Sequence, residues 1–282
     1  MKLTFIEDQC YREFLPAANN RPVFGLRCGC FTLEERMLKL LGSELDKVYY
    51  VMRPQLEADW NTQRFHSEKI RALFTLPEEG NVLLVNGRAL LSASSIREMR
   101  EKAARRKPYI WRDGEQWVSV YLPDHPVPFT ENELRGGSFD LGNLPLPSLS
   151  FKSPLIVNSW PELVNNHSRM IREDFGFISK RLRRLPVPPL PDNVAVLNRR
   201  NLVIGKFVEI DPFVTIDCRE GPVIIGDHVR IEPGVLIKGP MFIEDNRLIK
   251  ANSVLHERSS SEVSREILPI SGYVDNPSNS TG

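Results

Sequence analysis

Between Leu202 and Leu255 an aliphatic residue returns at every sixth position of the chain. A helix brings residues to one face at spacings of three, four and seven, and a strand at every second position, so neither explains this period. A period of six is typical of a parallel β-helix, in which one aliphatic side chain on each flat side points inward and a turn follows. With three sides to a coil, the pattern predicts about three coils. The anchors are Ile204, Ile210 and Ile216, then, after a three-residue slip, Ile225, Ile231, Ile237, Ile243, Ile249 and Leu255.

The residues between the anchors support the same interpretation. Small or charged residues follow the anchors, among them Gly205, Asp211 and Gly226, and we expect them to face water. Pro and Gly punctuate the turns, and residues 218–222 predict a small loop at one corner. Buried strands of a sandwich are the alternative, but a sandwich has no reason to keep one six-residue phase. A second inward position is predicted four places after the anchor, at Val208, Val214, Val229 and Val235.

The N-terminal part of the chain alternates between apolar strands and amphipathic helices. Thr32 and Glu35 have the spacing of a capping box, which predicts a helix to Leu41 that Gly42 ends. Alternating strands and helices predict an α/β domain with a mostly parallel sheet and a hairpin at its edge, turning at Asp113-Gly114. The expected strands are 3–6, 48–52, 81–85, 109–111 and 116–121, and the expected helices are 33–41, 55–60, 95–106 and 160–175.

Composition shifts predict where the domains end. Residues 122–154 are rich in Pro, Gly and Ser and predict a loop that could cover an active site. Residues 181–193 are basic and then proline-rich, which indicates a stiff linker, although a nuclear localisation signal is an alternative for the basic run. The expected organisation is an α/β domain over 1–180, this linker, a β-helix over 194–257 and an irregular tail over 258–282.

Composition also excludes several classes of protein. The chain has 282 residues, 41% of them hydrophobic, and a formal net charge of +1, so no global field favours nucleic acid or an anionic membrane. It contains no run of eighteen apolar residues and no signal-peptide pattern, so we expect a soluble cytoplasmic protein. Four cysteines form no disulfide framework in a chain of this length, and Cys28 and Cys30 are expected to be buried thiols rather than metal ligands.

Polar residues follow two of the predicted strands. Glu7 and Asp8 come directly after the first strand, and Asn86, Gly87 and Arg88 follow a later one. Because ligands gather at the carboxyl ends of parallel strands, these residues are expected at one edge, where the carboxylates could meet a metal or a sugar hydroxyl. A turn or helix-capping role is the alternative for the two acids.

A second candidate site lies in the segment from Arg21 to Gly29. Arg21 and Arg27 stand among prolines and glycines, and guanidinium groups pair bidentately with phosphate. Gly29 lets backbone N–H groups approach an anion. The pattern predicts an anion site, with arginines that hold carboxylates elsewhere in the fold as the alternative.

The layout of an α/β domain, a linker and a hexapeptide β-helix resembles the bifunctional sugar nucleotidyltransferases. Their best-known member joins an N-acetylglucosamine-1-phosphate uridyltransferase domain to a glucosamine-1-phosphate acetyltransferase β-helix. The chain more closely resembles a divergent bacterial branch of sugar nucleotidyltransferases, up to about Leu255. The resemblance implies a Rossmann-like nucleotidyltransferase domain followed by a short left-handed parallel β-helix. It rests on Phe5-Ile6-Glu7-Asp8, Leu15-Pro16, Arg21-Pro22-Val23, Leu26-Arg27-Cys28-Gly29, Val85-Asn86-Gly87-Arg88 and residues 160–175.

The resemblance implies transfer of a nucleotidyl group from a nucleoside triphosphate to a sugar 1-phosphate, with release of pyrophosphate and with Mg²⁺ as cofactor. By this resemblance Arg21 and Arg27 are catalytic residues that contact phosphate, and Asp8 is the candidate metal ligand. The residues expected to bind substrate or nucleotide are Glu7, Asp8, Gly29, Asn86, Gly87 and Arg88.

The chain departs from the better-known branch in both halves. No glycine follows Asp8 until Gly25, and Asn86 stands where a metal-binding aspartate is expected. A protein that binds nucleotide sugars without turnover, and oligomerises through its β-helix, is therefore an alternative. Ser261 interrupts the repeat, as a truncation or frameshift after about Glu257 would do, which leaves a remnant of an acyltransferase as a further alternative. His228 is expected to be a corner histidine rather than an acyl-transfer base, and about three coils predict a weak homotrimer or a monomer.

Overall fold

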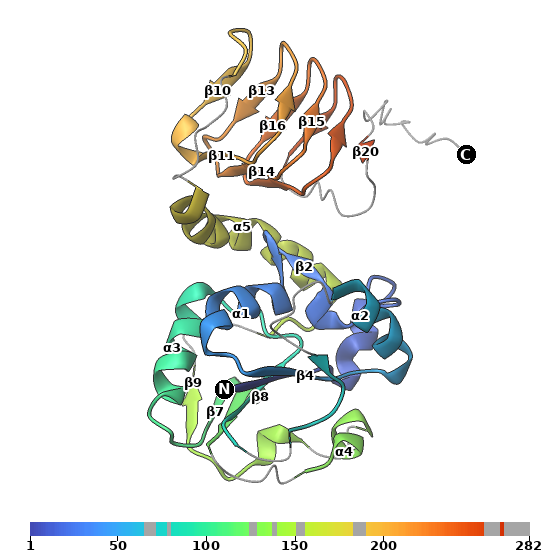
Figure 1. Ribbon diagram of the computed structural model, residues 1–282, viewed down its shortest axis with the longest axis vertical. Coiled ribbons are helices and arrows are strands. Elements are labelled where there is room, and N and C mark those ends of the chain that lie inside the picture. The colour runs from blue at the N-terminus through green and yellow to red at the C-terminus, as the bar shows by residue number, and fades with distance from the viewer. Residues whose placement is uncertain are drawn as a thin grey trace, which may run out of the picture. The chain divides into compact units, whose positions relative to one another are not determined.

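The computed structural model divides the chain into two compact units, Met1–Met170 and Ile171–Gly282 (Figure 1). The division falls within helix α5, which spans Trp160–Leu182 and is longer than the helix expected over 160–175. Most of the expected proline-rich linker lies outside the described residues, so its boundaries stay a prediction. The structure describes residues 1–64, 72–77, 80–123, 129–136, 140–150, 156–182, 190–256 and 266–267.

A seven-stranded sheet forms the centre of the N-terminal unit, in the order β5-β4-β1-β6-β8-β7-β9. The apolar run of β1 (Lys2–Ile6) lies between β4 (Lys47–Val51) and β6 (Val82–Asn86), and both neighbours are parallel to it. These three strands confirm the predicted parallel core of the sheet. The other strands are β5 (Ala72–Leu73), β7 (Tyr109–Asp113), β8 (Gln116–Leu122) and β9 (Ser148–Ser150).

The hairpin of β7 and β8 is antiparallel and turns at Gly114, which has a φ of 58°. The prediction that this hairpin forms the edge of the sheet is wrong, because β9 pairs with β7 in parallel outside it. Residues 122–154, the Pro-, Gly- and Ser-rich stretch, are therefore not only a loop. They contain β9 and also the helix α4 (Glu131–Gly136). In β9 the side chain of Leu149 packs against the core, which gives this short strand a reason to pair with β7.

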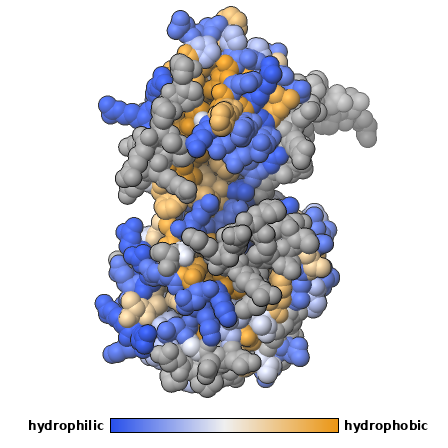
Figure 2. All heavy atoms as spheres, viewed as in Figure 1, coloured by the Kyte–Doolittle hydropathy of each residue, from blue (hydrophilic) through white to orange (hydrophobic). Residues whose placement is uncertain are grey.

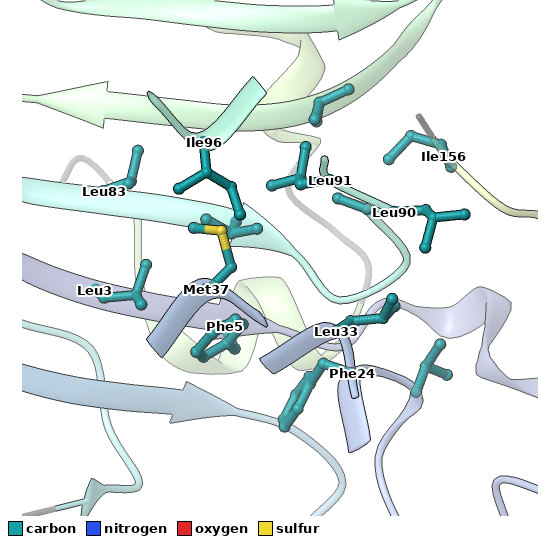
Figure 3. Packing of buried hydrophobic residues seen from close by; sticks show 14 of the residues in the cluster. Leu3, Phe5, Phe24, Leu33, Met37, Leu83, Leu90, Leu91, Ile96 and Ile156 are labelled. Carbon is teal, nitrogen blue, oxygen red and sulfur yellow. The ribbon is translucent and has the colours of Figure 1, made fainter. Parts of the chain in front are cut away.

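Helices α1 and α3 cover one face of the sheet (Figure 1). The predicted capping box is present at the start of α1 (Leu33–Leu41), where Thr32 and Glu35 exchange side-chain and backbone hydrogen bonds. Figure 3 shows Met37 of α1 and Ile96 of α3 (Ala93–Ala103) among the core side chains that β1 and β6 contribute. A second buried cluster on the other face includes Leu134 of α4. The remaining helix, α2 (Glu57–Arg64), supplies Trp60 to the first cluster.

The C-terminal unit is built from three short parallel sheets with the orders β10-β13-β16-β19, β11-β14-β17 and β12-β15-β18-β20. Because each strand pairs with the strand one coil later, the chain winds as a parallel β-helix, as the six-residue period predicts. The strands are β10 (Ala195–Leu197), β11 (Leu202–Ile204), β12 (Glu209–Ile210), β13 (Thr215–Asp217), β14 (Val223–Ile225), β15 (Arg230–Ile231), β16 (Leu236–Lys238), β17 (Met241–Ile243), β18 (Leu248–Ile249) and β19 (Val254–Leu255).

The aliphatic anchors form the interior of this β-helix. Ile216, Ile237 and Leu255 pair in register across one sheet, and all three are at most 2% exposed. Only Ile210 is less than fully buried among the nine anchors, and it too packs against the same cluster. The predicted second inward position is confirmed at Val214, Val229 and Val235. The periodic pattern therefore identified most of the core of this unit. Val208 is only partly buried, and the pattern did not predict the buried residues Cys218, Val223 and Met241.

Gly205 and Gly226 have a different role from the one expected of them. Instead of merely facing water, they lie where adjacent coils approach closely. A Cβ atom on Gly205 would lie 2.6 Å from the carbonyl carbon of Gly226, and one on Gly226 would lie 2.7 Å from the backbone nitrogen of Asp245. The absence of a side chain, rather than polarity, explains these two glycines.

Two corners of the β-helix place residues at positive φ three positions after the anchor. Phe213 has a φ of 64° and is 71% exposed, whereas the same corner carries Gly234 and Asn252 in the next two coils. Bulky side chains rarely adopt this conformation, while Gly and Asn tolerate it. Figure 2 shows hydrophobic residues gathered among hydrophilic ones on the C-terminal unit.

We expect Phe213→Asn to raise the free energy of unfolding of the C-terminal unit by about 1 kcal/mol. The substitution relieves the positive-φ strain and removes a side chain that buries little surface. Differential scanning calorimetry would measure the change. A fall in the transition temperature would contradict the strain argument and indicate that Phe213 contributes a stabilising contact.

Part of the expected irregular tail is ordered. Glu266 and Ile267 form β20, which pairs in parallel with β18 so that Ile267 lies opposite Ile249. The expectation of an irregular tail therefore does not hold at these two residues. An aliphatic residue 18 positions after Ile249 continues the repeat on this side of the coil, although Ser261 interrupts the pattern on another side. Within the described part of the chain, no helix is long and apolar enough to span a bilayer.

Candidate functional site

The carboxyl ends of three neighbouring strands carry the polar residues of the candidate site. Ile6, the last residue of β1, lies in register with Val51 of β4 and with Asn86 of β6. Glu7 and Asp8 follow Ile6, Gly87 and Arg88 follow Asn86, and Arg53 lies two positions after Val51. The register confirms that the residues after β1 and those after β6 meet at one edge, as predicted, and Arg53 joins them from the end of β4.

Glu7 is buried within a network of hydrogen bonds. Its side chain is 1% exposed and accepts a bond from Arg53 Nε to Oε2 at 2.9 Å. Oε1 accepts one from the backbone nitrogen of Val23 at 3.0 Å. Arg53 Nη2 also donates to the carbonyl oxygens of Ala18 and Arg21, at 2.6 and 3.0 Å. The Glu7–Arg53 pair thereby fastens the segment before Val23 to the ends of β1 and β4.

Asp8 forms a second ion pair at the same edge. Arg88 Nη2 lies 2.8 Å from Asp8 Oδ2, and Arg88 Nε donates to both oxygens of the carboxylate. Arg88 Nη1 donates in turn to Asn158 Oδ1 at 2.6 Å and to the carbonyl of Val157 at 3.2 Å. The side chain of Arg88 is 6% exposed and that of Asp8 is 25% exposed. This pair connects the end of β1 to the segment that leads into α5.

Asn86 and Gly87 complete the strand end of β6. Asn86 Oδ1 accepts from the backbone nitrogen of Arg88 at 2.9 Å, and Asn86 Nδ2 donates to the carbonyl of Trp117 at 3.2 Å. The Gly87 amide donates to the carbonyl oxygen of Ile6 at 2.7 Å. A Cβ atom on Gly87 would lie 2.8 Å from that same oxygen, so these two segments of the chain approach too closely for any other residue.

We expect Gly87→Ala to lower the free energy of unfolding of the N-terminal unit by about 1–3 kcal/mol, because backbone must shift to admit the methyl group. All four tryptophans lie in this unit, so urea unfolding followed by tryptophan fluorescence reports on it alone. Gly42→Ala is the matched control, since a Cβ at Gly42 meets nothing within 4 Å. Equal effects of the two substitutions would contradict the close-approach argument.

The structure does not bring all the predicted anion-binding residues to this edge. Arg21 is exposed, and its carbonyl accepts the bond from Arg53 described above. Arg27 lies in the hairpin of β2 (Arg27–Cys28) and β3 (Phe31–Thr32), where its Nη1 atom is 3.6 Å from Glu35 Oε2. Gly29 occupies the turn of that hairpin at a φ of 82°, and its amide donates to His167 Nδ1 at 3.1 Å. Arg27 and Gly29 therefore have structural partners in and around the hairpin.

Sequence reasoning missed Arg53 as a member of the site. Arg53 follows a buried strand in the same way as the residues after β1 and β6 do, and that pattern could have identified it. Asn158 had no comparable signal, because it meets Arg88 from 70 residues away in the sequence. The expected corner position of His228 is confirmed, since it has a φ of 56° and its ring stacks on that of Phe207 at 4.9 Å.

The cysteines are free thiols. Cys28 and Cys30 are buried, as predicted, and Cys10 is exposed in the segment after Asp8. Partial burial raises the pKa of Cys10, and the carboxylate of Asp8 raises this pKa further. A raised pKa lowers the fraction of Cys10 present as the reactive thiolate.

The strand-end carboxylates do not fit a magnesium site in their present arrangement. Mg²⁺ requires oxygen ligands with free lone pairs in octahedral geometry. Both oxygens of Glu7 and both oxygens of Asp8 accept hydrogen bonds from arginine. The two carboxylates and the two guanidinium groups also sum to zero formal charge. Among the residues that the structure describes, no group of three or more His, Cys, Asp or Glu side chains could hold a metal ion.

Comparisons with known proteins identify the N-terminal unit. The family model described as "Sugar nucleotidyl transferase" matches residues 3–182, which is more than half of the chain. No curated protein matches the sequence. Solved structures that match part of the chain include a protein assigned as a glucose-1-phosphate thymidylyltransferase from Bacillus anthracis (10% identity, 61% of this chain and 95% of the other, TM-score 0.42). Another is the 4-diphosphocytidyl-2C-methyl-D-erythritol synthase from Anaerococcus prevotii (12% identity, 61% of this chain and 99% of the other, TM-score 0.36).

Proposed function

Because the chain belongs to the sugar nucleotidyl transferase family, we propose that it transfers a nucleotidyl group from a nucleoside triphosphate to a sugar 1-phosphate. The family match over residues 3–182 carries this proposal. The polar edge formed by the ends of β1, β4 and β6 supports it, since ligands of open α/β sheets bind outside the carboxyl ends of the strands.

In the proposed reaction, a phosphate oxygen of the sugar 1-phosphate attacks the α-phosphorus of the triphosphate. The bond from the α-phosphorus to the oxygen that bridges it to the β-phosphorus breaks, and pyrophosphate leaves with that oxygen and its electron pair. Positioning and neutralisation of charge are the main contributions a protein makes to such a transfer. The proposed step does not use a metal ion held by the strand-end carboxylates, because these carboxylates are already paired with arginine.

Arg21 is the residue we propose to contact the phosphates. Its side chain is exposed, while the bond from Arg53 to its carbonyl holds its backbone near the strand ends. Asn86 and Gly87 are proposed to border the nucleotide or sugar, because Asn86 ends β6 at the same edge and Gly87 follows it. Arg27 is the second proposed phosphate contact, and its Nη1 atom donates to the carbonyl of Cys30 at 2.5 Å.

A pyrophosphate-release screen tests the proposed activity. Purified protein with Mg²⁺, each nucleoside triphosphate and a set of hexose 1-phosphates is expected to release pyrophosphate with at least one pair. Arg21→Ala is expected to lower kcat/KM by about 100-fold or more, since an arginine that neutralises transferring phosphates contributes several kcal/mol. Arg199→Ala on the β-helix is the control and is expected to keep full activity. Absence of release with every pair would refute the proposal.

A nucleotide-sugar-binding protein without turnover is the second candidate. The pairing of Glu7 and Asp8 with arginine favours it, because neither of these two carboxylates is then free to hold a catalytic cation. This candidate predicts that nucleotides or nucleotide sugars raise the transition temperature of the N-terminal unit while no pyrophosphate is released. The two measurements together separate it from the enzyme.

A further inference from the structure

We infer that Glu7 and Asp8 are positioning residues that hold Arg53 and Arg88 in place, and that they are not ligands of a divalent cation. The inference rests on the proposed function, because it concerns how the same site binds the phosphate groups of its substrates. It follows from the acceptor capacity, burial and charge of these residues.

The acceptor capacity of Glu7 is used within the protein. Oε1 accepts from the backbone nitrogen of Val23 and from Arg53 Nη2, at 3.0 and 3.3 Å. Oε2 accepts from the backbone nitrogen and from Nε of Arg53, at 3.3 and 2.9 Å. A carboxylate oxygen offers about two acceptor positions, so these four bonds fill the group. A cation could bind Glu7 only if Val23 or Arg53 first lost the carboxylate as its hydrogen-bond acceptor. Leaving such a buried donor without an acceptor costs free energy.

Asp8 is more accessible but is also neutralised. Oδ1 accepts from the backbone nitrogen of Cys10 at 3.1 Å and from Arg88 Nε, while Oδ2 accepts from Nε and lies 2.8 Å from Nη2. A cation at Asp8 would displace Arg88, whose guanidinium would then keep only the neutral acceptors Gln116, Val157 and Asn158. Removing the counterion of a buried charge is strongly unfavourable. Asn86 is a poorer ligand than a carboxylate because it is neutral, and its Oδ1 already accepts one bond from the backbone nitrogen of Arg88.

Arg53 and Arg88 each hold a different segment of the chain against the strand ends. Arg53 bonds to the carbonyls of Ala18 and Arg21, and its guanidinium lies 4.1 Å from the centre of the Tyr11 ring. Arg88 bonds to Val157 and Asn158 on the way to α5. Each carboxylate therefore orients an arginine that fixes a different segment. On this arrangement, a divalent cation used in the reaction is one that the triphosphate brings with its own phosphate oxygens.

Mn²⁺ titration followed by electron paramagnetic resonance tests the inference on the full chain without nucleotide. The free Mn²⁺ signal is expected to persist in the presence of wild-type protein up to millimolar concentrations. Glu7→Gln and Asp8→Asn are expected to lower the thermal midpoint by the same amount in EDTA and in Mn²⁺. Micromolar binding of Mn²⁺ to the wild type that Asp8→Asn abolishes would overturn the inference.

Inorganic pyrophosphate is a second probe, since its binding does not depend on the base or the sugar. In EDTA, calorimetric titration is expected to show binding to the wild type, and about tenfold weaker binding to Glu7→Gln and Asp8→Asn. The first substitution releases Arg53, which bonds to the carbonyl of Arg21, and the second releases Arg88. Asp211→Asn, which touches an exposed arginine of the β-helix at 3.8 Å, is the control and is expected to bind as the wild type does. Binding that neither variant weakens would overturn the inference.

These results remain separable from the proposed activity. A protein that releases no pyrophosphate in the screen, yet binds pyrophosphate in EDTA and leaves Mn²⁺ free, keeps the positioning role and loses the enzymatic one. A protein that turns over substrate and binds Mn²⁺ through Asp8 keeps the activity and loses the positioning role.

Discussion

Arg53→Met is expected to lower the free energy of unfolding of the N-terminal unit by about 3–5 kcal/mol, the usual cost of breaking a buried ion pair on one side. The substitution leaves the Glu7 carboxylate, which is 1% exposed, without its counterion. It also removes the donors to the Ala18 and Arg21 carbonyls. Methionine retains most of the length of the apolar stem, so loss of the charged group dominates the effect.

Urea unfolding followed by tryptophan fluorescence measures this change. Arg230→Met is the matched control, because Arg230 is 57% exposed and lies 3.8 Å from Glu209 and from Asp211. An exposed pair of this kind contributes about 1 kcal/mol or less, so the control is expected to change little when the β-helix is followed by circular dichroism. An effect of Arg53→Met no larger than that of Arg230→Met would show that the Glu7–Arg53 pair does not hold the site together.

Ile237→Ala is expected to lower the free energy of unfolding of the C-terminal unit by about 2–5 kcal/mol. Ile237 is 0% exposed and lies between Ile216 and Leu255 in the same interior column, so neighbouring coils constrain how far the structure can relax into the cavity. The loss then includes both the burial of the removed atoms and the empty volume left behind.

The C-terminal unit contains no tryptophan, so tryptophan fluorescence does not report on its unfolding. Far-UV circular dichroism or calorimetry measures this second change instead. Ile210→Ala is the matched control at the same repeat position, since Ile210 is only partly buried and its truncation is expected to destabilise the unit less. The opposite order, with Ile210→Ala as the more damaging change, would contradict the account of the interior ladder.

The candidate site shows how far local patterns extend. Strands that end in polar residues predicted that Glu7, Asp8 and Asn86 to Arg88 would share an edge, because parallel strands align their carboxyl ends. The pairing of those residues was not predictable in the same way. Glu7 meets Arg53 across 46 positions, and Arg88 meets Asp8 across 80. The acids were expected either to be available for a metal or a hydroxyl or to cap a turn or helix, and Asp8 does cap the turn that follows it. Both acids also pair with arginines that follow other strands.

The edges of both units show the same limit. The β7–β8 hairpin was expected at the edge of the sheet, yet β9 from a loop-like stretch pairs outside it. In the β-helix, Ile267 joins its column after an interruption at Ser261. A two- or three-residue strand has too few positions to show a period, so its existence depends on the unpaired backbone it meets.

The sequence by itself determined the β-helix and its interior, the capping box of α1 and the parallel strands that end at the polar edge. These features repeat a rule along consecutive residues, so each local segment contains the information that specifies it. Only the tertiary structure decided which arginine neutralises which carboxylate, that Gly87 lies against the carbonyl of Ile6, and that β9 closes the sheet. Those contacts join residues far apart in the chain, and their geometry exists only once the strands have been brought side by side.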